Sequence, residues 1–198
     1  MTTCLSARGI IIYRLSYGNT STIVRCMTRE AGLISLMAKG AQRPRSPFLG
    51  HIDLFYYVDL LYIPSRNSDL HLLKEIKMLH PHLGLRQSYT TFLTAHYFAE
   101  LIEAISEKNT PIPHEYELFE KALNYLQETP VTTRVIHRFE RRLLEIAGVQ
   151  PANISHRAGS HPPMPSTDPL IRGFYQLQAT VPNLRREVFK ALTQASSS

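Results

Sequence analysis

The residues best suited to bind a ligand lie in a basic stretch that directly follows an apolar run. This stretch, SLMAKGAQRPRSPFLG at residues 35–50, contains Lys39, Arg43 and Arg45 but no acidic residue. Lysine and arginine bind phosphate oxygens, and a glycine such as Gly40 lets a ligand approach the backbone closely. Without a helix that reads bases, such a loop predicts binding that is independent of base sequence. The alternative interpretation is a solvated connection between two strands.

The net charge of the chain is concentrated in its first quarter. The chain has 22 lysines and arginines against 16 acidic residues, a formal charge of +6. Residues 1–50 contain seven of these cations and only one acid, Glu30, whereas residues 51–198 contain equal numbers of each sign. A local basic excess attracts polyanions, so the distribution favours a nucleic-acid partner over a generally basic surface. The candidates for phosphate binding are Arg14, Lys39, Arg43 and Arg45.

A second basic cluster lies in TTRVIHRFERRLLEIAG, residues 132–148. Arg134, Arg138 and Arg142 are four residues apart and therefore form one ridge on a predicted helix. Neither Arg134 nor Arg138 has an acid three or four residues away, whereas Arg142 can pair with Glu145. Such a ridge beside apolar positions suits an acidic, partly hydrophobic peptide. A solvated basic face is the alternative interpretation.

Short β-like runs follow one another from residue 8 to about residue 76. They are RGIIIYRL, STIVRCMT, LISLMAK, HIDLFYYVDLLYI and DLHLLKEI. Turn-forming residues separate them at intervals of about ten residues, which predicts a small barrel or sandwich. The fourth run is long enough to bend around a barrel, and its alternation places Val58 and Leu60 on one face and Phe55 and Tyr57 on the other. Its aromatic residues fit a core better than a surface that stacks on bases.

The pattern changes to helical after residue 87. Apolar residues recur every four positions over residues 88–105, from Tyr89 to Ile105, and a similar pattern follows over residues 113–126. With residues 132–148, capped by Thr132 or Thr133 and ended by Gly148, these segments predict a helical bundle. Residues 151–169 contain five prolines and predict a linker or mobile loop, and residues 184–194 predict a last short helix. The overall fold class is therefore α+β.

No pattern typical of an enzyme, a cofactor site or a membrane protein is found in the chain. Phosphate-binding glycine loops, nucleophile elbows and dinucleotide fingerprints are absent. The two cysteines are too few for a disulfide framework or a cysteine-rich metal site. No apolar stretch approaches the roughly 18 residues of a membrane span. We therefore expect a non-enzymatic cytoplasmic protein with no catalytic residues, no cofactor and no metal.

Three stretches resemble the bacterial recombination mediator RecO family. They are YGNTSTIVRCMTREAGLISLMAKGAQRPRS, YFAEL and HRFERRLLEIAG. The resemblance extends from about Arg8 to Gly148, and GLxSLxAKGAxRxxS is its most specific part. It implies a five-stranded OB-fold barrel over residues 1–80 and a helical domain over residues 81–198 with a proline-rich insertion near residues 151–169. Many members bind zinc through four cysteines after the third helix, but GVQPANISHRAGSHPPMP has none.

The resemblance also implies a function in DNA repair and homologous recombination. Members bind single- and double-stranded DNA, anneal complementary strands and, with RecR, assist RecA loading on DNA coated by single-strand-binding protein (SSB). Lys39, Arg43 and Arg45 match the basic loop of the family, and His137 with Arg138 falls near its basic positions. The implied contacts for the SSB C-terminal tail are Arg134, His137, Arg138 and Arg142. An RNA-binding OB module and a basic partner-binding scaffold are the alternative functions, and we expect the protein near the nucleoid.

Overall fold

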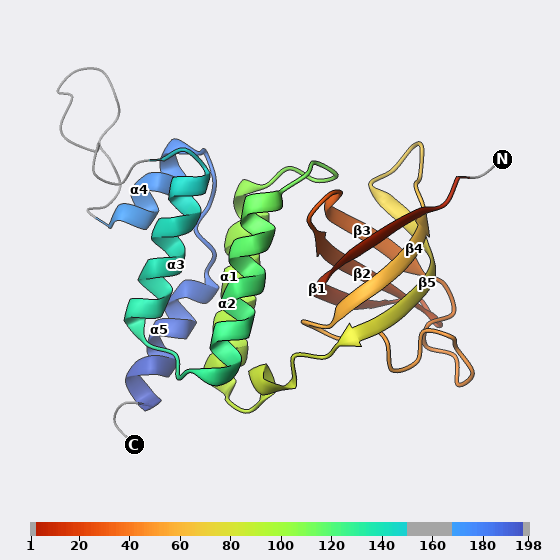
Figure 1. The fold of residues 1–198 in the computed structure, drawn as a ribbon, viewed down its shortest axis with the longest axis horizontal. Coiled ribbons are helices and arrows are strands. Elements are labelled where there is room, and N and C mark those ends of the chain that lie inside the picture. The colour runs from red at the N-terminus through yellow and green to blue at the C-terminus, as the bar shows by residue number, and fades with distance from the viewer. Residues whose placement is uncertain (1–2, 150–167, 196–198) are drawn as a thin grey trace. The chain divides into compact units, whose positions relative to one another are not determined.

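Five strands are followed by helices in the computed structural model, which describes residues 3–149 and 168–195 (Figure 1). The chain forms two compact units. The barrel unit is Met1–Leu83 with Ser106–Glu117, and the helical unit is Gly84–Ile105 with Leu118–Ser198. The predicted α+β class, a barrel followed by helices, is confirmed. The predicted domain boundary between residues 80 and 81 stays a prediction.

The barrel unit is a closed five-stranded sheet. Its strands are β1 (Leu5–Tyr17), β2 (Ser21–Thr28), β3 (Gly32–Ala38), β4 (Tyr57–Ile63) and β5 (Leu70–His80). They pair in the order β1-β2-β3-β5-β4, and β4 returns to pair with β1. Only β3 and β5 are parallel, while the other pairs are antiparallel. This closed Greek-key arrangement is the predicted OB-fold barrel.

Side-chain alternation fills the barrel interior. On β2, Val24 and Cys26 are completely buried, and on β3 Ile34 and Leu36 pack against them. The two strands pair Val24 with Leu36 and Cys26 with Ile34, so the same face of both strands points inward. Burial raises the pKa of the Cys26 thiol to about 12. Cys26 is therefore a protonated core residue rather than a reactive thiol.

The fourth β-like run differs from its prediction as one long strand. Residues 51–56 form turns, and β4 begins only at Tyr57. The cause is Phe55, whose φ of 64° places it in the left-handed region and interrupts the extended chain. Phe55 is almost completely buried, and its N–H donates to the carbonyl of Ile11 over 2.7 Å. The predicted alternation is correct from Val58 onward, where Val58 and Leu60 face the interior.

The connection between the first two helices belongs to the barrel unit. Near the start of β3, Asn109 donates its N–H to the carbonyl of Leu33 over 3.1 Å, and Lys108 bridges to Leu33. The Ser65 N–H donates to Nδ1 of His71, so the proton of the neutral ring is on Nε2. Nε2 of His71 therefore donates to Oδ1 of Asn109 over 3.1 Å. These contacts hold the connection along β3.

The helical unit contains the later part of the chain. After the short 3₁₀ helix η1 (Leu83–Arg86), its helices are α1 (Tyr89–Ile105), α2 (Pro113–Glu128), α3 (Thr133–Ile146), α4 (Pro169–Gln176) and α5 (Leu184–Ala195). The first five residues of α2 belong to the barrel unit. The rings of Phe98 and Phe139 stack with centroids 3.7 Å apart, which joins α1 to α3 in the core of the helical unit.

The start of α1 and the ends of α3 can be compared with the sequence predictions. Tyr89, where the predicted apolar repeat begins, is the first residue of α1; it is 70% exposed and precedes the turns that pack in the core. The predicted ends of α3 are confirmed: Thr132 is the N-cap, and Gly148 ends the helix with a φ of 78°. Hydrogen bonds from Gly148 to Glu145 and from Val149 to Leu144 complete a Schellman motif.

Two further predictions concern the proline-rich segment and the membrane. Residues 150–167, which include most of the predicted linker and of the cysteine-free stretch compared with the zinc site, lie outside the described residues. The helix α4, which begins at Pro169, was not predicted from the sequence. Over residues 3–149 and 168–195, no helix combines the length and hydrophobicity required to cross a membrane.

We predict that Gly32→Ala strongly destabilises the chain. Gly32 has a φ of +68°, and a Cβ there would overlap the carbonyl oxygen of Thr110. The backbone strain costs about 1–2 kcal/mol and the overlap about 1–3 kcal/mol more. Urea unfolding followed by circular dichroism measures the change, since the chain has no tryptophan. Gly18→Ala is the control. Its φ is +58° but no atom lies within 4 Å of the added Cβ, so this variant should lose only the free energy that corresponds to backbone strain. Equal destabilisation by both variants would contradict the close contact at Thr110.

Candidate functional site

The basic loop, residues 39–50, begins directly after β3. A succession of tight turns shapes it: the Arg43 N–H donates to the Gly40 carbonyl over 3.1 Å, and the Ser46 N–H to the Arg43 carbonyl over 3.0 Å. Gly40 has a φ of +75°, a conformation that glycine adopts without strain. The loop is therefore a folded segment with a defined backbone path.

Two anchors hold the basic loop against the barrel. At one end, Gln42 donates its backbone N–H to the Thr20 carbonyl over 2.9 Å and its side-chain Nε2 to the Ser21 carbonyl over 2.6 Å. At the other end, the side chain of Phe48 is buried in the barrel core. Arg43 and Arg45 lie between these anchors, so their backbone positions are fixed while their side chains remain exposed.

Acids from later in the chain neutralise most other cations of the first quarter. Arg8 pairs with Asp59 over 3.6 Å, Arg14 with Asp53 over 3.1 Å, and Arg29 with Glu117 over 2.7 Å. The Arg25 guanidinium lies 4.7 Å from the centroid of the Tyr13 ring. Lys39, Arg43 and Arg45 are exposed and have no ion pair among the described residues. The basic excess predicted from composition is thus concentrated in the basic loop.

Arg14 occupies a different environment from the three loop cations. Besides its ion pair with Asp53, its guanidinium donates to the Ile52 carbonyl over 3.4 Å. Together with Gln42 and Phe48 it lines a hollow of about 360 Å³ beside the basic loop. Arg14 therefore helps to fix the segment after the loop, and Asp53 compensates its charge.

The basic ridge of α3 lines a larger hollow in the helical unit, which we call the helical pocket. Its volume is about 970 Å³, and its lining includes Thr133, Arg134, His137, Arg138, Glu140, Arg141, Leu144, Asp168, Leu170 and Arg185. Arg134 and Arg138 are exposed and form no ion pair within the described part of the chain. Arg142, by contrast, pairs with Glu145 over 2.9 Å and does not line the pocket. The structure thus brings together three of the four predicted peptide-binding residues.

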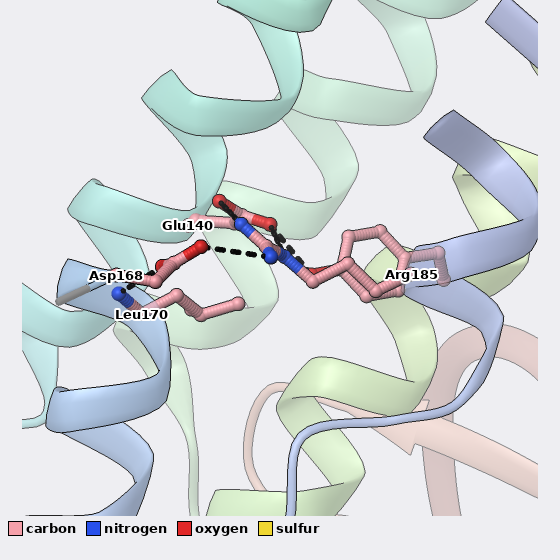
Figure 2. A network of polar contacts seen from close by, with 5 residues as sticks. Glu140, Asp168, Leu170 and Arg185 are labelled. Carbon is pink, nitrogen blue, oxygen red and sulfur yellow. Dashed lines mark hydrogen bonds and ion pairs between the residues drawn. The ribbon is translucent and has the colours of Figure 1, made fainter. Parts of the chain in front are cut away.

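A buried ionic network forms one side of the helical pocket (Figure 2). Arg185 of α5 donates to Glu140 of α3 over 2.9 Å and pairs with Asp168 over 2.9 Å. The Tyr97 hydroxyl also donates to Glu140, over 2.6 Å. Only 5% of the Glu140 side chain and 18% of the Arg185 side chain are exposed. One guanidinium therefore pairs with two carboxylates and links α3 to α5.

The network changes the acidity of its members. Burial raises the pKa of Tyr97, and the adjacent Glu140 carboxylate raises it further. Burial acts to lower the pKa of Arg185, but the hydrogen bond and charge of Glu140, together with Asp168, outweigh burial and raise it. Tyr97 and Arg185 therefore stay protonated as donors across the physiological pH range.

Sequence reasoning did not find this network. At helical spacing Glu140 reaches only His137, whereas its partner Arg185 stands 45 residues later. One local sign was available: Glu140 lies four residues after Ile136 and four before Leu144, so it interrupts the apolar stripe of α3. A charged residue in such a stripe indicates a buried carboxylate with a distant partner.

We predict that Arg185→Ala lowers the free energy of unfolding by about 3–5 kcal/mol, because it leaves the Glu140 carboxylate buried without its cation. Adding Glu140→Gln should restore part of this loss, since the amide carries no charge and still accepts from Tyr97. Urea unfolding of the two variants measures both effects. Arg186→Ala, at the neighbouring exposed arginine, is the control and should change stability by less than about 0.5 kcal/mol. A double variant less stable than Arg185→Ala would contradict the buried-charge explanation.

Comparison with known proteins gives matches to both units of the chain. The family model "Recombination protein O N terminal" matches residues 1–82, and "Recombination protein O C terminal" matches residues 86–168. Among curated proteins, DNA repair protein RecO of Halalkalibacterium halodurans is 30% identical over 148 residues, covering 73% of this chain and 56% of the relative.

Other RecO proteins match to a similar extent. That of Cyanothece sp. is 32% identical over 155 residues, covering 76% of this chain and 52% of the relative. That of Bacillus subtilis is 31% identical over 145 residues, covering 72% and 55%. The chain spans about half the length of the curated relatives that it matches. Because the two family models follow one another over most of the sequence, the chain belongs to the RecO family.

Proposed function

We propose that this chain is a non-enzymatic mediator of DNA repair and homologous recombination that binds single- and double-stranded DNA through the basic loop. The observation that carries the proposal is the set of three exposed cations on an anchored loop, Lys39, Arg43 and Arg45, in a chain of the RecO family. Phosphates are present in every DNA, so contacts of this kind give affinity without sequence selectivity.

The proposed activity is annealing of complementary strands, followed by assistance to RecA loading on SSB-coated DNA together with RecR. Two strands repel one another through their phosphates, and a basic loop that neutralises some of these charges lowers the repulsion. Annealing by this route needs no nucleotide hydrolysis and no catalytic residue. Lys39, Arg43 and Arg45 bind phosphates in this proposal, and Arg14, paired with Asp53, fixes the segment that follows the loop.

The helical pocket is the proposed docking site for the acidic C-terminal tail of SSB. Its lining contains four arginines against two carboxylates, and both carboxylates pair with Arg185, so Arg134 and Arg138 are left to bind an acidic peptide. His137 contributes a ring that lies 5.6 Å, centroid to centroid, from that of Phe189 on α5. Arg142, paired with Glu145, contributes long-range charge rather than a direct contact in this proposal.

We predict that replacing Lys39, Arg43 and Arg45 together by alanine weakens binding to single-stranded DNA and flattens its salt dependence. Three lost phosphate contacts should reduce the slope of log affinity against log salt by about 2. Fluorescence anisotropy across a salt series measures both quantities, and annealing without ATP should slow in parallel.

The matched control replaces Arg66, Lys74 and Lys77, three exposed cations of the barrel unit that lie outside the basic loop. It makes the same change in net charge. Equal effects from the two triple variants would show that the loop only contributes to general electrostatic steering, and would contradict direct phosphate binding by the loop. A single-stranded RNA competitor that displaces DNA at equal or lower concentration would favour the RNA-binding alternative. Failure to bind any nucleic acid at about 50 mM salt would favour a partner-binding scaffold.

We predict that Arg138→Ala abolishes most binding of an acidic SSB-tail peptide and leaves DNA affinity unchanged. Losing a charge-assisted contact to a carboxylate should weaken peptide binding about tenfold. Isothermal titration with the peptide, and anisotropy with DNA, test the two sites separately. Lys121→Ala, an exposed cation on α2, is the charge-matched control. Undiminished peptide binding by Arg138→Ala would contradict the pocket assignment.

A further inference from the structure

Arg185 divides its guanidinium contacts between two carboxylates that differ in accessibility (Figure 2). Its Nε and Nη2 donate to the two carboxylate oxygens of Glu140 over 2.9 and 3.4 Å. Its Nη1 pairs with Oδ2 of Asp168 over 2.9 Å. The side chain of Glu140 is 5% exposed, whereas that of Asp168 is 30% exposed. Asp168 is therefore the partner of Arg185 that a ligand can reach.

The guanidinium of Arg185 is held in place without Asp168. Besides its two bonds to Glu140, its central carbon lies 5.1 Å from the centroid of the Phe189 ring, within the range of a cation–π contact. These contacts fix the orientation of the guanidinium, so Nη1 would keep its position if Asp168 moved away. The helical unit thus contains a preorganised donor for a carboxylate, and Asp168 occupies it.

Asp168 also begins α4 at the wall of the helical pocket. Its Oδ1 accepts the N–H of Leu170 over 2.9 Å, which makes Asp168 the N-cap of that helix. Asp168, Leu170 and Arg185 line the pocket together with Arg134 and Arg138. One carboxylate therefore caps α4, ties it to α5 and lies where an acidic ligand would bind.

We propose that Asp168 is an internal competitor for acidic ligands of the helical pocket. A carboxylate of the bound peptide takes the place of Asp168 at Nη1 of Arg185, and α4 then loses its ionic tie to α5. The inference rests on the proposed function, because it assumes that an acidic peptide binds in this pocket. It goes further by assigning Arg185 as a ligand-binding residue and Asp168 as the residue that restrains binding.

The competition determines which acidic ligands the helical pocket selects. A carboxylate that replaces Asp168 exchanges one ion pair for another, so a ligand with a single carboxylate gains little affinity. A ligand with several carboxylates also pairs with Arg134 and Arg138, which form no ion pair within the described part of the chain. The pocket should therefore prefer peptides with clustered acidic residues.

The test removes the charge of Asp168 and keeps the helix cap. Asparagine and serine cap helices about as well as aspartate, so Asp168→Asn and Asp168→Ser should retain α4. Isothermal titration with the acidic SSB-tail peptide should show about fivefold tighter binding for both variants, because the ligand no longer displaces an internal ion pair. Asp168→Glu keeps the charge and should bind no more tightly than the parent.

The matched control is Glu187→Gln, which makes the same change in net charge. Glu187 is an exposed acid of α5 that does not line the helical pocket, so its replacement should leave peptide affinity nearly unchanged. Equal gains from Asp168→Asn and Glu187→Gln would reveal a general charge effect and would overturn the inference. Unchanged or weaker binding by both Asp168→Asn and Asp168→Ser would also overturn it.

A second measurement uses the unaltered chain, so it does not depend on the folding of any variant. Hydrogen–deuterium exchange, followed by mass spectrometry, compares the free chain with the chain saturated by the peptide. The peptide should speed amide exchange in α4, because that helix loses its tie to Arg185. Slower or unchanged exchange in α4 would show that the ion pair stays intact, and would contradict the competition.

The proposed function is judged separately by Arg138→Ala. Peptide binding that depends on Arg138 but does not tighten in Asp168→Asn would leave the docking site standing and overturn only the competition. Peptide binding by Asp168→Asn but not by the parent would support the competition and contradict docking in the unaltered chain. Absence of peptide binding by both would overturn both proposals.

Discussion

The strand order of the barrel determines where the basic loop lies. After β3 the chain cannot continue to a neighbouring strand, because β5 already lies beside β3 and β4 must reach β1 on the other side. The connection from residue 39 to residue 56 must therefore cross one end of the barrel. Phe48, buried in the core, and Gln42, bonded to the turn between β1 and β2, hold it there. The cations of the basic loop are positioned by this topological requirement.

In the helical unit, a buried charge fixes the positions of the helices. Glu140 lies within the apolar stripe of α3, where an unpaired carboxylate would be costly. Arg185 and Tyr97 provide donors from α5 and α1, so the need to satisfy one carboxylate fixes three helices relative to one another. Arg185 also reaches Asp168, and this second pair leaves the hollow beside α3 with a basic rather than an acidic lining.

The sequence allowed correct prediction of features that depend on neighbouring residues. Alternation placed Val58 and Leu60 of β4 on one face, and Thr132 and Gly148 marked the ends of α3. Features that depend on distant contacts were missed. Phe55 begins β4 later than alternation suggests because its left-handed backbone is hydrogen-bonded to Ile11, 44 residues earlier. The partner of Glu140 is equally distant, and no local pattern encodes it.

At the candidate site, too, the sequence shows where the cations lie along the chain, but only the structure shows which of them are paired. Counting charges located the basic excess in the first fifty residues, but it treated all seven cations alike. Folding brings Asp53, Asp59 and Glu117 against three of them, and these acids come from the segment before β4, from β4 and from α2. A segment's net charge therefore does not measure the potential at its surface, since pairing removes cations selectively. In this chain, pairing spares the basic loop that the topology holds at the end of the barrel.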